Sequence, residues 1–112
     1  MRPAMKARAE VQAGICAHHS RVEAETADGR TVTFAIGTTC DNIERFKARL
    51  AAEDPVDAYK EIDPRATSEV LTRGHEAGCC TDCIVPASAL KALRVATGLA
   101  LPADVAIGLA KD

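Results

Sequence analysis

Five cysteines are the residues of this 112-residue sequence whose type and spacing best suit chemistry. They are Cys16, Cys40, Cys79, Cys80 and Cys83. Cys80 and Cys83 are separated by two residues, which is the spacing of metal-binding and redox-active cysteine pairs. Coordination by four thiolates selects zinc or an iron–sulfur cluster. The pattern therefore predicts a thiolate-bound metal site, with either Cys79 or Cys80 left out because adjacent side chains point in different directions.

The three histidines are weaker candidates for the same site. His75 precedes the cysteine-rich loop 79–85 and could supply a further ligand, whereas His18 and His19 lie in a polar stretch and are expected to be solvated. Nucleophilic catalysis by Cys40, with His75 or His19 as the base, is disfavoured because nothing in the sequence fixes a base near that thiol. Each cysteine could also be a small buried hydrophobic residue instead of a ligand.

Composition excludes several other classes of protein. The net charge is −2 and aromatic residues make up 3% of the chain, so neither the basic stripe of duplex binders nor the stacking aromatics of single-strand binders is present. No apolar run approaches the ~18 residues of a membrane span. Residues 1–8 are basic but lack the apolar segment of a secretory signal. We therefore expect a cytoplasmic protein with reduced thiols, and no nucleic-acid or membrane partner.

The apolar content of the chain is weighted toward alanine. Hydrophobic residues make up 47% of the sequence, but 22 residues are alanine and tryptophan is absent. A core with so few large side chains has a small margin of stability, so a metal, a ligand or a partner subunit is expected to reinforce it.

The first third of the chain shows the alternation of half-buried strands. Segments 9–15, 21–27 and 31–37 place apolar residues at every second position. The residues that alternate are Val11, Ala13 and Ile15, then Val22, Ala24 and Thr26, then Val32, Phe34 and Ile36. Asp28-Gly29 between the last two segments is a strong hairpin signal. The pattern predicts a three-stranded antiparallel meander.

Helical signals dominate the rest of the sequence. Asp41 and Glu44 form a capping-box pattern that begins a helix to about residue 52, and Asp54-Pro55 ends it. Asp63-Pro64 is expected to begin a second helix that ends at Gly78. A third helix follows, with Pro86 in its first turn and Gly98 as its stop. Segment 56–62 could be a connector or a short strand. Charged residues on the first helix, namely Glu44, Arg45, Lys47 and Arg49, are predicted to form a solvated face.

A final strand is predicted where Val105, Ile107 and Leu109 alternate. The whole sequence then reads as a single α+β domain over residues 9–112, preceded by a flexible extension of residues 1–8. In this fold a meander plus a C-terminal strand carries about three helices on one face.

Strand direction predicts where the cysteines meet. Cys16 and Cys40 follow the first and third strands of the meander, which run the same way, so both thiols emerge at one end of the sheet. Their backbones would lie roughly 10 Å apart, twice the strand spacing. Loop 79–83 joins them if segment 56–62 is only a connector. It lies at the opposite end if that segment is a full-length strand.

Several motifs together resemble a small uncharacterised family that is associated with anaerobic bacteria and methanogenic archaea. They are Ala13-Gly14-Ile15-Cys16, Cys40 before a helix, Cys83-Ile84-Val85-Pro86, Lys91-Ala92, and Gly98-Leu99-Ala100-Leu101-Pro102 with Asp104-Val105. The resemblance covers nearly all of the chain after residue 8. The sequence departs from the family pattern at Ala17 and Ile84, where the family has glycine and proline.

The resemblance carries no activity, but it implies an order among the cysteines. Cys16, Cys40 and Cys83 would be the primary ligands, with Cys79 and Cys80 as variable partners. An anaerobic setting would also make an oxygen-sensitive cluster tolerable.

Two alternatives to a metal site remain open from the sequence. One is a metal-free interaction module that dimerises through segment 99–109 as a shared strand edge. The other is a thiol redox protein that uses Cys80 and Cys83 without a metal.

Overall fold

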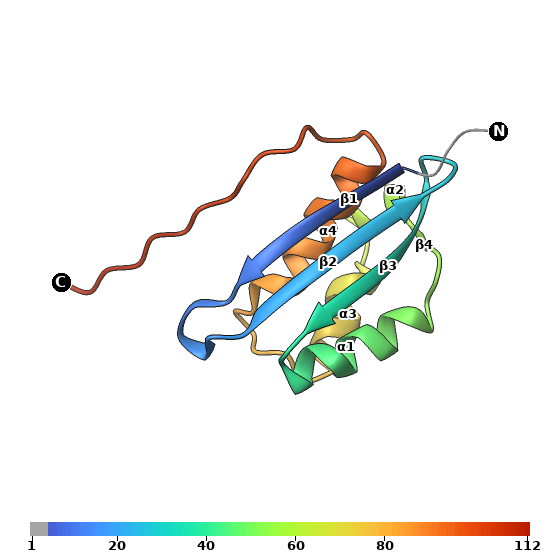
Figure 1. Ribbon diagram of the computed structural model, residues 1–112. Helices are drawn as coiled ribbons and strands as arrows, with labels where there is room; N and C mark the ends of the chain where they lie inside the picture. Colours follow the sequence, from blue (N-terminus) through green and yellow to red (C-terminus); the bar gives the residue numbers. More distant parts are fainter. Residues whose placement is uncertain (1–4) are drawn as a thin grey trace.

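A computed structural model describes residues 5–112 and confirms the α+β class (Figure 1). One antiparallel sheet has the strand order β1-β2-β3-β4. Its strands are β1 (Met5–Gln12), β2 (His19–Thr26), β3 (Thr31–Thr38) and β4 (Val56–Asp57).

The predicted meander is confirmed, together with its central hairpin. Val22 of β2 lies opposite Ala9 of β1 and Ile36 of β3, so the apolar alternation of the three strands falls on one face. Gly29 adopts a φ of +76° in the β2–β3 turn. The Asp28 carboxylate accepts backbone N–H bonds from Arg30 and Thr31, at 2.9 and 2.8 Å, which fixes the turn.

The first strand lies earlier in the chain than its sequence pattern predicts. It starts at Met5, so residues 5–8 of the predicted extension are part of the sheet, and residues 1–4 lie outside the described residues. It also ends at Gln12, because Gly14–Cys16 form a 3-10 turn, η1, flanked by positive φ angles at Gly14 and Ala17. Ile15, predicted to face the core, is fully exposed in this turn.

The helices cover the apolar face of the sheet (Figure 1). They are α1 (Asp41–Ala51), α2 (Ala58–Glu61), α3 (Glu69–Glu76) and α4 (Ile84–Ala96). Helix α4 packs on β1 and β2, and α1 packs on β3. Ala89, Ala92 and Ala96 of α4 are buried, and Phe46 and Leu50 of α1 are fully enclosed. The three small alanine side chains on one face of α4 therefore allow close packing of this helix against the sheet.

Two predicted helix starts are wrong. Cys40, not Asp41, is the N-cap residue of α1. Helix α3 begins at Glu69 instead of near Pro64, because the Asp63 carboxylate accepts the Arg65 N–H in a local turn. The predicted stops are correct, since Gly78 and Gly98 follow α3 and α4 with φ of +83° and +78°.

Segment 56–62 is not a full-length strand. Two residues, Val56 and Asp57, pair with Val32 and Thr31 at the far end of β3, and α2 follows at once. Helix α1 therefore leads away from Cys40 and α3 returns. This topology brings the α3–α4 loop to the end of the sheet where β1 and β3 terminate (Figure 1).

The predicted C-terminal strand is wrong for the single chain. Residues 99–112 form no strand and run out from α4 as an extended, largely exposed tail (Figure 1). The fourth strand of the sheet is β4 instead. Within residues 5–112, no helix has the length and apolar character needed to cross a membrane.

Candidate functional site

The α3–α4 loop is fastened to the first turn of α1. Arg45 Nε donates to the backbone carbonyl of Ala77 at 3.0 Å, and Cys79 Sγ lies 3.8 Å from the carbonyl oxygen of Asn42. Because α1 starts directly after Cys40, these contacts place the loop cysteines beside the end of β3. The three segments that carry cysteines thus share one end of the molecule.

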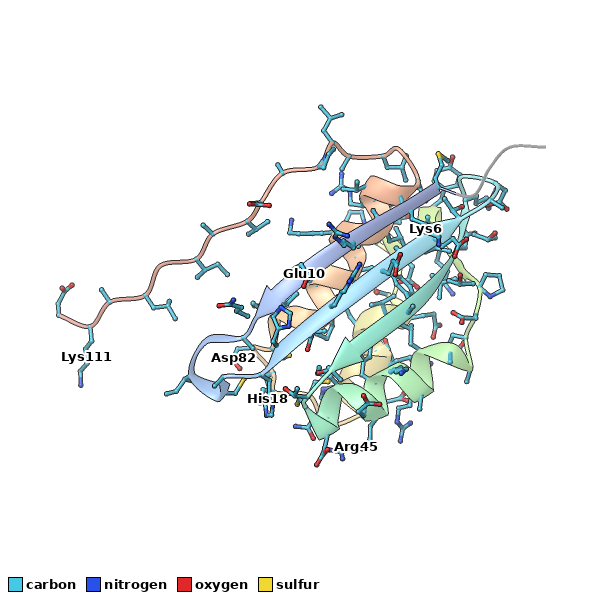
Figure 2. The ribbon with its side chains drawn as sticks, in the orientation of Figure 1. Lys6, Glu10, His18, Arg45, Asp82 and Lys111 are labelled. Atoms are coloured by element: carbon cyan, nitrogen blue, oxygen red, sulfur yellow. The ribbon has the colours of Figure 1, made fainter. Side chains whose placement is uncertain are left out.

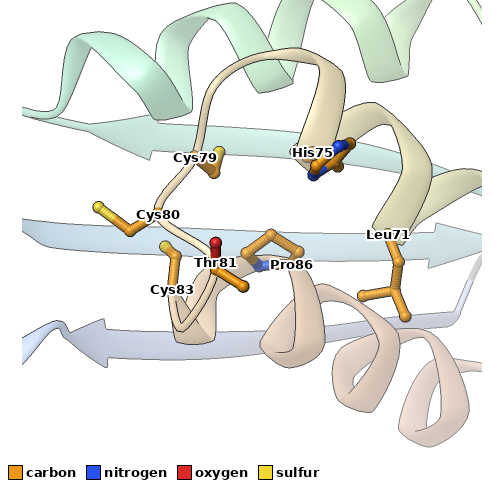
Figure 3. Close-up of a pocket in the computed structure, with 8 residues that line it drawn as sticks. Leu71, His75, Cys79, Cys80, Thr81, Cys83 and Pro86 are labelled. Carbon is orange, nitrogen blue, oxygen red and sulfur yellow. The ribbon is translucent and has the colours of Figure 1, made fainter.

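The loop is a compact pair of turns. The Cys79 N–H donates to the carbonyl of Gly74 at 3.2 Å, and the Cys83 N–H donates to the carbonyl of Cys80 at 2.9 Å. The second bond folds the Cys-x-x-Cys segment back on itself. A shallow hollow beside it is lined by Leu71, Gly74, His75, Cys79, Cys80, Thr81, Cys83 and Pro86 (Figure 3).

Gly74 determines how closely α3 approaches α4 beneath this hollow. A Cβ atom at this position would lie 2.8 Å from Cγ of Pro86. Only glycine permits this separation, and the same residue anchors Cys79 through its carbonyl.

Cys83 is the thiol that interacts electrostatically with all of the others. Burial raises its pKa, and so do Cys80, Cys40 and Cys16, while the Val85 N–H acts in the opposite direction. Burial also raises the pKa of Cys79 to about 11, with added contributions from Cys83, Cys40 and Cys80 and a lowering contribution from Arg45. Such mutual effects require the thiols to be close together in a partly dehydrated region.

Two of these thiols occupy helix N-caps. Cys40 precedes α1 and Cys83 precedes α4, and neither side chain makes a capping hydrogen bond. A helix N-terminus favours negative charge. These two helices therefore direct positive potential at Cys40 and Cys83, and at Cys83 this opposes the burial that raises its pKa.

The remaining candidates lie farther from the group. Cys16 is exposed in η1, and its Sγ is 3.7 Å from the carbonyl oxygen of Ala13. His75 is exposed on α3 and lines the hollow away from the sulfur atoms of Cys80 and Cys83 (Figure 3).

The other two histidines have partners of their own. His18 Nδ1 is 2.9 Å from Thr39 Oγ1, and exposed His19 pairs with Glu10 at 3.2 Å. Figure 2 shows His18 in the β1–β2 connection and Glu10 on β1.

The observed side-chain positions do not form a ready-made coordination site. Within residues 5–112, no group of three or more His, Cys, Asp or Glu side chains has an arrangement that could hold a metal ion. Cys40, Cys79 and Cys83 are half-buried, and Cys16 and Cys80 are exposed.

Arg45 is exposed, as predicted, but it has a further role near this group that the sequence pattern does not predict. Its guanidinium bonds the Ala77 carbonyl, contacts Asn42 Oδ1 and lowers the pKa of Cys79. Its main partner is a backbone carbonyl 32 positions away in the chain. No local pattern in the sequence encodes such a contact.

Comparison with protein families finds a match over residues 7–109 to a family of unknown function, DUF6951. The chain belongs to this family. The match begins two residues into β1, spans every later strand and helix of the described fold and extends through most of the C-terminal tail. Comparisons with curated proteins and with solved structures find no match.

Proposed function

We propose that this member of the DUF6951 family binds a zinc ion or an iron–sulfur cluster through cysteine thiolates at the end of its sheet. Cys40, Cys80 and Cys83 would be central ligands, with Cys79 or Cys16 completing the set. The observation that carries the proposal is the position of Cys83, whose pKa is raised by thiols from both other cysteine-bearing segments as well as from its own loop.

The chemistry of the group favours a bound cation. Cys79 and Cys83 are half-buried thiols whose pKa values are raised by burial and by neighbouring cysteines, and they cannot both ionise without a neutralising charge. A soft metal ion supplies that charge and displaces the protons on binding. The N-termini of α1 and α4 would further stabilise a metal–thiolate centre that carries net negative charge.

We expect binding to require only local rearrangement, because the thiols sit in three connections, the β1–β2 turn, the β3–α1 junction and the α3–α4 loop. None of them lies inside a strand or an α-helix. Exposed Cys80 and Cys16 can change rotamer without disturbing the core. Closure around a metal would join the three connections and reinforce an alanine-rich core, which is a stabilising role that needs no catalysis.

A metal-free thiol redox function needs a thiolate nucleophile in the Cys-x-x-Cys pair. Burial and neighbouring thiols raise the pKa of Cys83, so the exposed Cys80 would have to be the attacking thiol. The proposed centre also needs reduced thiols, which fits a reducing compartment such as the cytoplasm.

The proposal is tested by metal analysis of protein purified without oxygen. Iron and zinc are measured per chain, and the visible spectrum is recorded. Iron with broad visible absorbance identifies a cluster, and one colourless zinc per chain identifies a zinc site. Less than a tenth of a metal ion per chain, in protein never exposed to a chelator, would overturn the proposal.

Two variants in the same loop provide the matched comparison. Cys83→Ser should abolish stoichiometric metal, because it removes the thiol linked to all the others. Thr81→Ser lies between the paired cysteines, is exposed and should retain the metal. Equal metal content in the two variants would refute the ligand assignment. His75→Asn should also keep its metal if the site is built from thiolates alone.

A further inference from the structure

The C-terminal tail exposes more apolar surface than any other segment of the described chain. Leu101, Val105, Ile107 and Leu109 are 90, 61, 67 and 92% exposed, and residues 101–112 are all classed as exposed. The family match includes this segment as far as residue 109. Side chains of this type are normally covered in the functional form of a protein.

The start of the tail is held in a direction that carries it away from its own body. The N–H groups of Leu99 and Ala100 both donate to the Arg94 carbonyl, at 2.8 and 3.1 Å. Gly98 turns the chain at a φ of +78°, and Pro102 follows with a ring-fixed φ. The extended course beyond α4 is therefore set by backbone bonds at its base (Figure 1).

The sheet offers an open edge of matching length. Strand β1 pairs only with β2, so the other side of Met5–Gln12 carries unpaired backbone groups among the described residues. Ala7, Ala9 and Val11 face the helices, where Val11 is buried and both alanines are partly buried against the core. An edge of this kind accepts an added strand.

We propose that the tail of one copy adds as a fifth strand to the β1 edge of a second copy, and that the exchange is reciprocal. Parallel pairing with Val105 beside Ala7 places Ile107 beside Ala9 and Leu109 beside Val11. The large side chains of these three tail residues then lie on the core-facing side of the sheet, over α4. The intervening tail residues, Ala106, Gly108 and Ala110, are small and fall on the opposite face.

Charge selects this direction of pairing. In the parallel register Asp104 lies beside Lys6, on the outer face of the sheet (Figure 2 shows Lys6 near the start of β1). The antiparallel register that keeps Ile107 beside Ala9 pairs no opposite charges and places Lys111 beside Met5, on the core-facing side of the sheet. A reciprocal exchange is isologous and closes at two chains.

The experiment measures the mass of the full chain by sedimentation equilibrium and light scattering, in reducing buffer with chelator. We expect a concentration-dependent dimer. Ile107→Glu should raise the dimer dissociation constant at least tenfold, whereas the matched control Ala106→Glu, on the small-residue face beside Arg8, should raise it no more than threefold. Neither change touches the core of the single chain, so both proteins should fold.

A charge exchange tests the register. Asp104→Lys alone should weaken the dimer, and addition of Lys6→Asp in the same chain should restore it. Hydrogen exchange should show protection of amides 105–109 that is lost on dilution. A monomer at all concentrations, including one with a protected tail folded on its own β1 edge, would overturn the proposal. So would equal effects of the changes at 106 and 107.

Discussion

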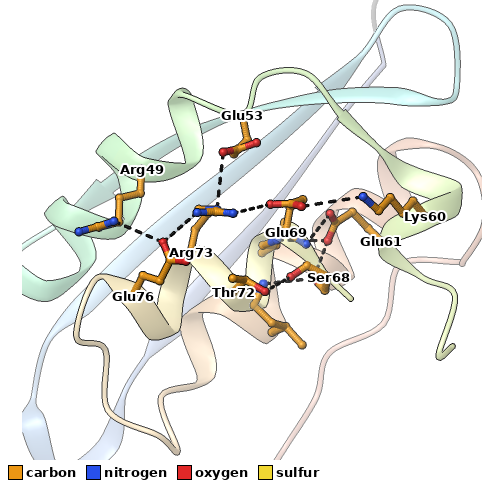
Figure 4. A network of polar contacts seen from close by, with 11 residues as sticks. Arg49, Glu53, Lys60, Glu61, Ser68, Glu69, Thr72, Arg73 and Glu76 are labelled. Atoms are coloured by element: carbon orange, nitrogen blue, oxygen red, sulfur yellow. Dashed lines mark hydrogen bonds and ion pairs between the residues drawn. The ribbon is translucent and has the colours of Figure 1, made fainter. Parts of the chain in front are cut away.

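Substitution of the buried carboxylate of Glu61 by alanine should destabilise the protein more than removal of any surface charge. Glu61, at the end of α2, is 5% exposed. Its carboxylate accepts the N–H groups of Glu69 and Val70, at 2.8 and 3.2 Å, and the hydroxyl of Ser68 at 2.5 Å (Figure 4). Ser68 Oγ in turn accepts the Leu71 N–H at 3.1 Å. These two side chains satisfy the first three N–H groups of α3.

The expected cost follows from these bonds. Val70 is fully buried, so its N–H would lose its partner with no access to water, at about 1–3 kcal/mol. The Glu69 N–H and the Ser68 hydroxyl are partly exposed and can be rehydrated, which adds about 1 kcal/mol. Glu61→Ala should therefore lower the free energy of unfolding by about 3 kcal/mol. Ser68→Ala, the loss of a single cap, should cost about 1 kcal/mol.

Urea unfolding monitored by circular dichroism measures this difference. With a denaturant dependence of about 2 kcal/mol per molar, the midpoint for Glu61→Ala should fall by about 1.5 M. The control is Glu76→Ala, which removes a carboxylate from α3, the helix that Glu61 caps. Glu76 is exposed and pairs with Arg49 and Arg73, at 3.3 and 2.8 Å, so its loss should cost less than about 1 kcal/mol. Equal midpoints for the Glu61 and Glu76 variants would refute the capping argument.

Three further predictions concern Gly74 of α3, the β2–β3 turn and the Cys79 thiol. Gly74→Ala should lower the free energy of unfolding by about 1 kcal/mol, measured in urea, because crowding against the ring of Pro86 in α4 outweighs the gain in helix propensity. The control Gly37→Ala, with open space around it, should show no such loss. Backbone N–H bonds hold the pKa of Asp28 well below its ordinary 3.8, so its stabilisation is complete above that pH and declines as pH falls further; the destabilisation caused by Asp28→Asn should shrink in melts run below about pH 4, and a constant difference would contradict this. The pKa of Cys79 is raised to about 11, so in metal-free protein at pH 8 this thiol should react with iodoacetamide at least tenfold more slowly than the exposed Cys80. Mass spectrometry measures both rates, and comparable rates would show that the Cys79 thiol is not shielded by burial.

Local patterns were sufficient wherever a signal spans a few residues. The alternation around Val22 and Val32, the Asp28-Gly29 turn and the glycines that end α3 and α4 are all found as predicted. The pattern missed the start of α3, although its N-cap residue Ser68 is local; the second cap, the Glu61 carboxylate, comes from eight positions before Glu69, where no local pattern marks it. The sequence also marks Asp63 as a cap, but that carboxylate bonds a different turn.

The C-terminal segment shows a structural outcome that its local pattern did not predict. Alternation at Val105, Ile107 and Leu109 is typical of a strand, but a strand needs a neighbour, and no other segment of residues 5–112 is placed beside it. Pattern alone predicts that a segment can pair. Whether it does pair depends on which backbone edge lies within reach.

The sequence by itself determined the chemistry available to this protein and the direction of its strands. It identified five thiols and placed two of them at the same end of a meander. Only the tertiary structure decided that the α3–α4 loop joins them, because that depended on whether residues 56–62 cross the sheet or merely touch its edge. In the structure only Val56 and Asp57 pair with β3, and the helical turn α2 follows at once, so the segment does not cross the sheet. How far this segment pairs depends on its packing against β3, which no local sequence pattern expresses.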